Sequence, residues 1–199
     1  MTKHPLATKL KEYHLVLASG SPRRKQFFKD LGLEVEIRLQ AVEEVYPEHL
    51  KADEIPSFLA RLKATAFKGT LAPNEILITS DTVVWHNGQS LAKAKNKEEA
   101  IEMLQQLSGS WHEVITAVCF TTIDKQLLTS ATTKVKFAKL SDTEIEFYVS
   151  AFQPFDKAGA YGIQEWIGAI GVEQIEGTYN NVVGLPTHLV YKTLMDMVS

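Results

Sequence analysis

The sequence has little cysteine, no long apolar run and no strong excess of either charge. Cys119 is its single cysteine, so an internal disulfide is impossible, and a reduced, cytoplasmic setting is expected. No segment approaches the roughly 18 apolar residues of a membrane span, and residues 1–14 lack the apolar core of a signal peptide. The net charge of −3 gives no basis for binding nucleic acid or a membrane surface.

The chain also lacks internal repeats and low-complexity segments. Its 199 residues are enough to bury a substantial core, and 45% of them are apolar. We therefore expect a single domain over residues 1–199, in which residues 1–12 form an N-terminal extension.

Apolar periodicity and turn signals predict helices and strands that alternate early, followed by long antiparallel strands. The expected strands cover 13–18, 34–39, 75–85, 113–124, 128–138 and 167–175, and the expected helices cover 22–31, 56–68, 97–107, 141–151 and 186–197. The apolar strand 75–85 is interrupted at its middle by the polar triplet Ser80-Asp81-Thr82. This order predicts the α/β class with a mixed sheet.

Two arginines in the stretch "LASGSPRR" lie at the start of an expected helix, where the helix dipole disfavours positive charge. A strand that runs into a small-residue turn and a helix start exposes free backbone N–H groups, which favour anions. Ser19 and Ser21 add hydroxyl donors, and Gly20 allows close approach. A bound polyphosphate would offset the cost of Arg23 and Arg24, because guanidinium groups suit phosphate oxygens. The alternative is that both arginines simply extend into water.

Carboxylates supply the second set of candidates. Asp81 follows an apolar run, so it must be paired, bind a metal or lie at a sheet edge. Glu43 and Glu44 follow the second expected strand. A structural aspartate and an exposed acidic loop remain open as alternatives. Together with phosphate-binding groups, these carboxylates fit a divalent cation, Mg²⁺ or Mn²⁺, held between protein oxygens and substrate phosphates.

Lysines and a glycine-rich loop complete the candidate site. Lys63 lies on the expected helix after the acidic loop, and Lys93 follows the hairpin signal Asn87-Gly88; either could be a plain surface lysine. In "DKAGAYGIQ", Gln164 offers a paired donor and acceptor that can read a base edge, although an ordinary turn explains the composition equally well.

Other reactive side chains carry weaker signals. Cys119 lies within an expected strand and reads as a small buried hydrophobe. His86, His112 and His188 lack the spacing of a zinc site.

The order of several motifs resembles the Maf family, also called septum-formation-inhibitor-like proteins. These motifs are "LASGSPRR", "EE", "LARLKA", "SDTVV", "LAK", "SGSWHEVITAV", "DKAGAYGIQ" and "NNVVGLP". The resemblance extends over nearly the whole chain. It implies an elongated, two-lobed α/β fold with a mixed sheet and a central cleft, similar to inosine-triphosphate pyrophosphatases. It also implies hydrolysis of nucleoside triphosphates to the monophosphate and diphosphate with a divalent metal, and suggests a homodimer.

The resemblance assigns roles residue by residue. Asp81 matches the family's proposed general base. The carboxylate pattern itself makes Glu44 and Asp81 the expected metal ligands. Ser19, Arg24, Glu44, Lys63 and Lys93 match the family's other polar cleft positions, and the helix-start pattern adds Gly20 and Ser21 to the expected phosphate-binding residues. Arg23, Thr82 and Gln164 match the positions that set base preference, and this trio resembles the subgroup acting on dTTP and UTP. Modified pyrimidine triphosphates are an alternative substrate class, and a nucleotide-sensing regulator of cell division is an alternative function.

Two positions depart from the family pattern. Lys93 is followed by Ala94 where the family has proline, which would loosen that loop. Glu165 and Trp166 follow Gln164 where many members have a small residue, so we expect the mouth of the base pocket to be altered.

Overall fold

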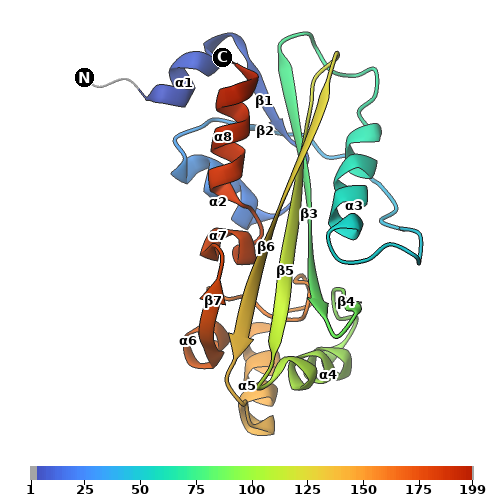
Figure 1. Ribbon diagram of the computed structural model, residues 1–199, viewed down its shortest axis with the longest axis vertical. Coiled ribbons are helices and arrows are strands. Elements are labelled where there is room, and N and C mark those ends of the chain that lie inside the picture. Colours follow the sequence, from blue (N-terminus) through green and yellow to red (C-terminus); the bar gives the residue numbers. More distant parts are fainter. Residues whose placement is uncertain (1–3, 199) are drawn as a thin grey trace.

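A single mixed sheet runs along the long axis of the molecule in the computed structural model, which describes residues 4–198 (Figure 1). The strands within that range follow the order β2 (Glu36–Ile37), β1 (His14–Leu17), β3 (Glu75–His86), β5 (Trp111–Thr121), β6 (Gln126–Phe137) and β7 (Val172–Glu176), and β4 (Gln89–Leu91) pairs with β3. β1 is parallel to β2 and β3, and the remaining pairs are antiparallel. The predicted α/β class with a mixed sheet is confirmed.

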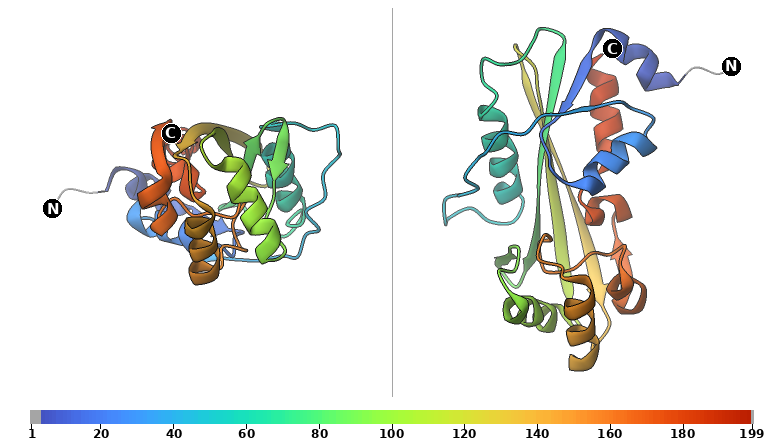
Figure 2. Two further views of the ribbon diagram at one scale, coloured as in Figure 1. Left: turned by 90° about the horizontal axis from the view of Figure 1, so that it is seen from below. Right: turned by 180° about the vertical axis from the view of Figure 1, so that it is seen from behind.

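Helices cover both faces of the sheet and its lower end (Figures 1 and 2). They are α1 (Pro5–Lys9), the 3₁₀ turn η1 (Leu10–Glu12), α2 (Pro22–Asp30), α3 (Glu54–Thr65), α4 (Lys97–Leu107), α5 (Asp142–Phe152), α6 (Trp166–Gly171), α7 (Tyr179–Val183) and α8 (Thr187–Met197). Among residues 4–198, no helix has both the length and the apolar character needed to cross a membrane.

The upper half of the molecule in Figure 1 has a core on each face of the sheet, because alternate residues of a strand point to opposite faces. Ile76 and Ile78 of β3 pack with Phe28 of α2 and with α8, whereas Leu77 packs against α3. Residues 5–12 of the expected N-terminal extension contribute Leu6 to the first of these cores. Residues 1–3 of that extension lie outside the described part of the chain.

The lower half has a core of its own beneath α4 and α5. Leu104, Phe137 and Tyr148 are fully buried there, and Tyr161 from the glycine-rich loop is buried beside them. Loop 156–165, which we define by those residues, is therefore packed through an aromatic side chain on this core.

β3 is continuous through its polar triplet, which confirms the strand expected over residues 75–85. Asp81 pairs with Ala117 in the middle of a ladder with β5 that runs from Leu77 to Trp85. On the opposite edge, β1 pairs with residues 75–78 and β4 with residues 84–86, so residues 79–83 have no strand beside them. Asp81 thus lies at an open strand edge and not at a strand end.

Several local predictions are confirmed. Asn87 and Gly88 both have positive φ values in the β3–β4 turn, as a two-residue hairpin requires. Ser141 and Glu144 form a capping box at α5, and Cys119 is fully buried.

The predicted strand 167–175 is wrong in its first half, because residues 166–171 form α6 and the strand begins at Val172. Glycines in this segment made a helix unfavourable by propensity, yet Gly168 is needed there: a Cβ on it would lie 1.8 Å from the carbonyl oxygen of Ile163. Close packing against loop 156–165 thus outweighs local preference. The second expected strand is also shorter, at two residues, and α1 and α7 were not predicted.

Candidate functional site

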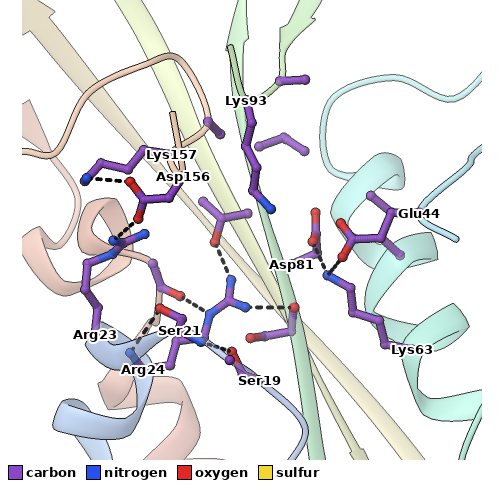
Figure 3. Close-up of a pocket in the computed structure, with 18 of the residues that line it drawn as sticks. Ser19, Ser21, Arg23, Arg24, Glu44, Lys63, Asp81, Lys93, Asp156 and Lys157 are labelled. Carbon is purple, nitrogen blue, oxygen red and sulfur yellow. Dashed lines mark hydrogen bonds and ion pairs between the residues drawn. The ribbon is translucent and has the colours of Figure 1, made fainter. Parts of the chain in front are cut away.

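A cavity of about 970 Å³ opens beside the unpaired edge of β3. It is lined on one side by the β1–α2 turn, on another by the loop before α3 and α3 itself, and on a third by the segment after β4 and loop 156–165 (Figure 3). The residues to which the sequence analysis gave a role all line it: Ser19, Gly20, Ser21, Arg23, Arg24, Glu44, Lys63, Asp81, Thr82, Lys93 and Gln164. Glu43 does not.

The first wall of the cavity is the start of α2. Ser21 is the N-cap, its hydroxyl accepting the Arg24 N–H at 3.5 Å, and the Ser21 N–H donates to Ser19 Oγ at 3.2 Å. Pro22 supplies no N–H at the first helical position, which suits a helix start. The serines therefore order the turn that would face an anion.

Arg24 is held by three hydrogen bonds to other elements. Its guanidinium donates to the carbonyl oxygens of Ser80 at 3.1 Å and Gly184 at 3.0 Å, and to Thr82 Oγ1 at 3.0 Å (Figure 3). Burial lowers the pKa of Arg24, while the Asp81 carboxylate opposes that shift. Because a guanidinium has five N–H donors, Arg24 can hold the open edge of β3 and still contact a ligand.

The second wall carries the carboxylates. Lys63 Nζ of α3 lies 2.6 Å from Asp81 Oδ1 and 3.1 Å from Glu44 Oε1. Burial raises the pKa of the Asp81 carboxyl group, and Lys63 opposes the rise. Two carboxylates that share one ammonium group are close enough to share a divalent cation, and carboxylate oxygens suit Mg²⁺ when phosphates complete the ligand set. The residues present therefore fit a metal.

Thr82 points to the opposite face of the sheet from Asp81, since the two residues are adjacent on β3. Its hydroxyl contacts Thr116 Oγ1 at 2.9 Å as well as Arg24. Beneath them Asn181 of α7 is fully buried and donates to the carbonyl oxygen of Val114 at 3.0 Å. Asn181 belongs to the motif "NNVVGLP", but nothing in its spacing predicted this supporting role.

The third wall is formed by Lys93 and loop 156–165. Lys93 points into the cavity (Figure 3) and forms a β-bridge with Ala158. Gly159 has φ +68°, and its N–H donates to the Leu91 carbonyl oxygen at 3.0 Å. A Cβ on Gly159 would lie 3.0 Å from Val84, so this glycine allows the loop to pack closely on β3.

A second cluster with metal-ligating side chains lies away from the cavity lining. It contains His14, Glu36 and Glu75. Arg38 donates to both glutamates, at 2.8 Å and 2.7 Å, and lowers the pKa of each. Because the cluster lies outside the cavity and Arg38 links its two glutamates, it reads as a structural tie between β1, β2 and β3.

The sequence of this chain was compared with models of known protein families. The model of the family described as "Maf-like protein" matches residues 14–197. This chain belongs to the Maf-like family. The resemblance seen in the sequence motifs is therefore confirmed, and it covers both halves of the molecule and all walls of the cavity.

Relatives of this Maf-like chain are similar over their whole length. A protein of Flavobacterium johnsoniae named "dTTP/UTP pyrophosphatase" is 56% identical over 97% of this chain and 100% of its own. A protein of the same name from Christiangramia forsetii is 54% identical over 96% of this chain and 97% of its own. Among solved structures, a HAM1 protein from Coxiella burnetii shares the fold, with a TM-score of 0.50 and 15% identity over 92% of this chain and 99% of its own.

Proposed function

We propose that this Maf-like protein hydrolyses dTTP and UTP to the nucleoside monophosphate and diphosphate. The observation that carries the proposal is a single cavity in which serine hydroxyls, a helix start and arginines face a pair of carboxylates. The hydroxyls, the helix start and the arginines would bind the negative charge of a triphosphate. The carboxylates would activate the water that hydrolyses it. The names of relatives that are 54–56% identical support the choice of substrate.

Triphosphate binding falls to the first wall. Backbone N–H groups at the start of α2, together with the Ser19 and Ser21 hydroxyls, would donate to phosphate oxygens. Arg23 and Arg24 would add charge-assisted hydrogen bonds from their remaining N–H groups. The positive charge at the positive end of α2 is then stabilising once the anion is bound.

Hydrolysis falls to the second wall. Glu44 and Asp81 would hold Mg²⁺ or Mn²⁺, which when bound would compensate the charge of the phosphate oxygens. Asp81 would accept a proton from the water that attacks the α-phosphorus. The bond from the α-phosphorus to the bridging oxygen breaks, and Lys63 and Lys93 would stabilise the negative charge of the departing diphosphate.

Base selection falls to the side of the cavity occupied by Arg23, Thr82 and Gln164. The Gln164 amide carries a donor and an acceptor side by side, which matches the adjacent acceptor and donor on the edge of uracil and thymine. Cytosine presents the same two kinds of group in reverse order, so a Gln164 amide held in one orientation would leave polar groups unpaired, which would cost binding free energy. Thr82 would act through its hydrogen bond to Arg24.

The test is product analysis with purified protein on dTTP, UTP, CTP, GTP, ITP and 7-methyl-GTP, each with Mg²⁺ or Mn²⁺ and with a chelator as control. We expect UMP and diphosphate in equal amounts, with dTTP and UTP cleaved at least about tenfold faster than the others. Orthophosphate as the product would contradict the proposed bond, and equal rates on GTP would contradict the base preference. Tight nucleotide binding without turnover would favour a sensing role instead.

A further inference from the structure

A row of alternating charges joins helix α2 to loop 156–165. Arg23 Nη1 donates to Asp156 Oδ2 at 2.9 Å (Figure 3). Lys157 Nζ then lies between two carboxylates, 2.7 Å from Asp156 Oδ1 and 3.0 Å from Glu165 Oε1. Each end of the loop is therefore held by an ion pair, and one of these pairs connects it to the proposed phosphate wall.

The row ends on a buried tyrosine of the lower core. The Tyr148 hydroxyl of α5 donates to Glu165 Oε2, and it accepts the N–H of Gly162 at 3.0 Å. Burial and the hydrogen bond to Glu165 raise the pKa of Tyr148, so the hydroxyl keeps its proton. Tyr148 thus holds the loop at two points, the side chain of Glu165 and the backbone of Gly162.

Tyr148 and Glu165 differ from the other members of the row in position. Arg23, Asp156 and Lys157 line the cavity, as does Gln164, whereas Tyr148 and Glu165 do not. They can therefore influence a bound nucleotide only through the residues that they hold.

The backbone at Gly162 couples Glu165 to Gln164. A Cβ on Gly162 would lie 2.7 Å from Gln164 Nε2 and 2.9 Å from Glu165 Cδ. Both side chains thus pack against the same stretch of backbone, whose N–H is bonded to Tyr148. Releasing Tyr148 would free the surface on which the Gln164 amide rests.

We propose that Tyr148 and Glu165 are positioning residues that set base selectivity from outside the cavity, by fixing loop 156–165 and with it the Gln164 amide. This inference rests on the proposed function for its kinetic consequence, although the fixing of the loop does not depend on which nucleotide is cleaved. The departure from the family pattern at Glu165 is on this view part of the recognition apparatus.

The first test measures the loop without nucleotide. Tyr148→Phe keeps the ring in the core but removes the acceptor of the Gly162 N–H and the donor to Glu165. We expect amide hydrogen exchange in a peptide covering residues 160–166 to become about 3–10-fold faster, since a net hydrogen bond is worth about 1 kcal/mol. Tyr191→Phe on α8 is the matched control, because it removes the same hydroxyl far from the loop, and it should leave this peptide unchanged.

The second test measures selectivity. In Tyr148→Phe we expect the ratio of kcat/KM for UTP to that for CTP to fall about 3–10-fold, through a higher KM for UTP and with kcat changed less than about twofold. A partly unfolded preparation would lower kcat/KM for UTP and for CTP by the same factor, so their ratio would not change. Glu165→Gln keeps an acceptor for Tyr148 but loses the charge facing Lys157, and the double variant should lose less selectivity than the product of the two single losses.

The outcomes separate this inference from the proposed function. Unchanged exchange of residues 160–166 in Tyr148→Phe overturns the positioning role, and an unchanged UTP:CTP ratio overturns its link to selectivity. A wild-type protein that cleaves all nucleotides equally contradicts the proposed base preference instead. The link to selectivity then falls with it, while the exchange experiment still decides whether Tyr148 fixes the loop.

Discussion

Two walls of the cavity are built by different means. Asp81 lies on a strand whose ladder with β5 is continuous for several residues on either side of it. Loop 156–165 has one β-bridge, at Ala158, with backbone bonds from Gly159 beside it, and side chains from β5, α2 and α5 hold the rest of it. The proposed hydrolytic group is thus positioned by backbone hydrogen bonds, and the proposed base-reading group by side-chain contacts. We expect sequence changes to alter selectivity more readily than hydrolysis.

The largest effect should come from Asp81→Asn, which keeps shape but removes the base and a metal ligand. We expect kcat to fall about 10²–10⁴-fold while the unfolding midpoint stays near that of the wild type. Steady-state diphosphate release and thermal melting measure the two. Asp124→Asn, in the β5–β6 turn, is the control and should retain full activity. Wild-type turnover in Asp81→Asn would remove this residue from the mechanism.

The next largest effect is the difference in protein stability between alanine substitutions at two glycines of α6. A Cβ on Gly168 would meet the Ile163 carbonyl oxygen at 1.8 Å, whereas one on Gly171 would meet the flexible Leu140 side chain at 3.1 Å. We expect Gly168→Ala to lower the free energy of unfolding by about 3 kcal/mol and Gly171→Ala to change it by less than about 1 kcal/mol. Urea denaturation of both variants measures this. Equal effects would mean that α6 does not press on loop 156–165.

A smaller effect concerns pH and the anchor of the loop. His112 of β5 contacts the Tyr161 hydroxyl at 2.7 Å, and burial, with a contribution from His86, lowers the pKa of His112 to about 3. The unfolded chain binds a proton near pH 6.5 and the folded chain does not, so acidification favours unfolding. From about pH 7 to about pH 5 we expect a loss of about 1–2 kcal/mol in unfolding free energy.

Denaturant titrations at several pH values measure the slope of the unfolding free energy against pH. Two variants test whether His112 causes that slope. His112→Gln should flatten the slope, since glutamine does not titrate. His188→Gln, at an exposed position, should leave it unchanged. A slope that survives in His112→Gln must come from another group.

The smallest effect should follow Gln164→Ala. We expect the ratio of kcat/KM for UTP to that for CTP to fall about tenfold, with kcat on UTP nearly retained, because one amide contact to a base edge is lost. Kinetics with both nucleotides on one preparation measure the ratio. A loss of kcat comparable to that of Asp81→Asn would show that the two walls are not functionally separate.

The sequence predicted the parts of the fold that depend on local signals. Ser141 predicts a helix start through its side chain, and Asn87 predicts a hairpin through its backbone preference. Both preferences act within a few residues. Gly168 shows where such reasoning fails, because its helix depends on a carbonyl oxygen brought close by packing. The break in pairing along β3 also escaped prediction, since it depends on where β1 ends and β4 begins.

The site divides in the same manner. Motif order indicated which residues belong together, and the cavity contains them, but their roles stay predictions. Tyr148 and His112 carry no motif that marks them as supports of the loop, since a buried aromatic ring and a strand histidine look like ordinary core residues in a sequence. Their importance depends on contacts between α5, β5 and a loop distant in sequence.

The open edge of β3 has a consequence for colloidal behaviour. Unpaired strand edges invite pairing with another chain and hence aggregation. Here the carbonyl oxygen of Ser80 is covered by Arg24, whose charge also discourages a second strand from docking. Replacing Arg24 would therefore lower the solubility of the protein even in the absence of nucleotide.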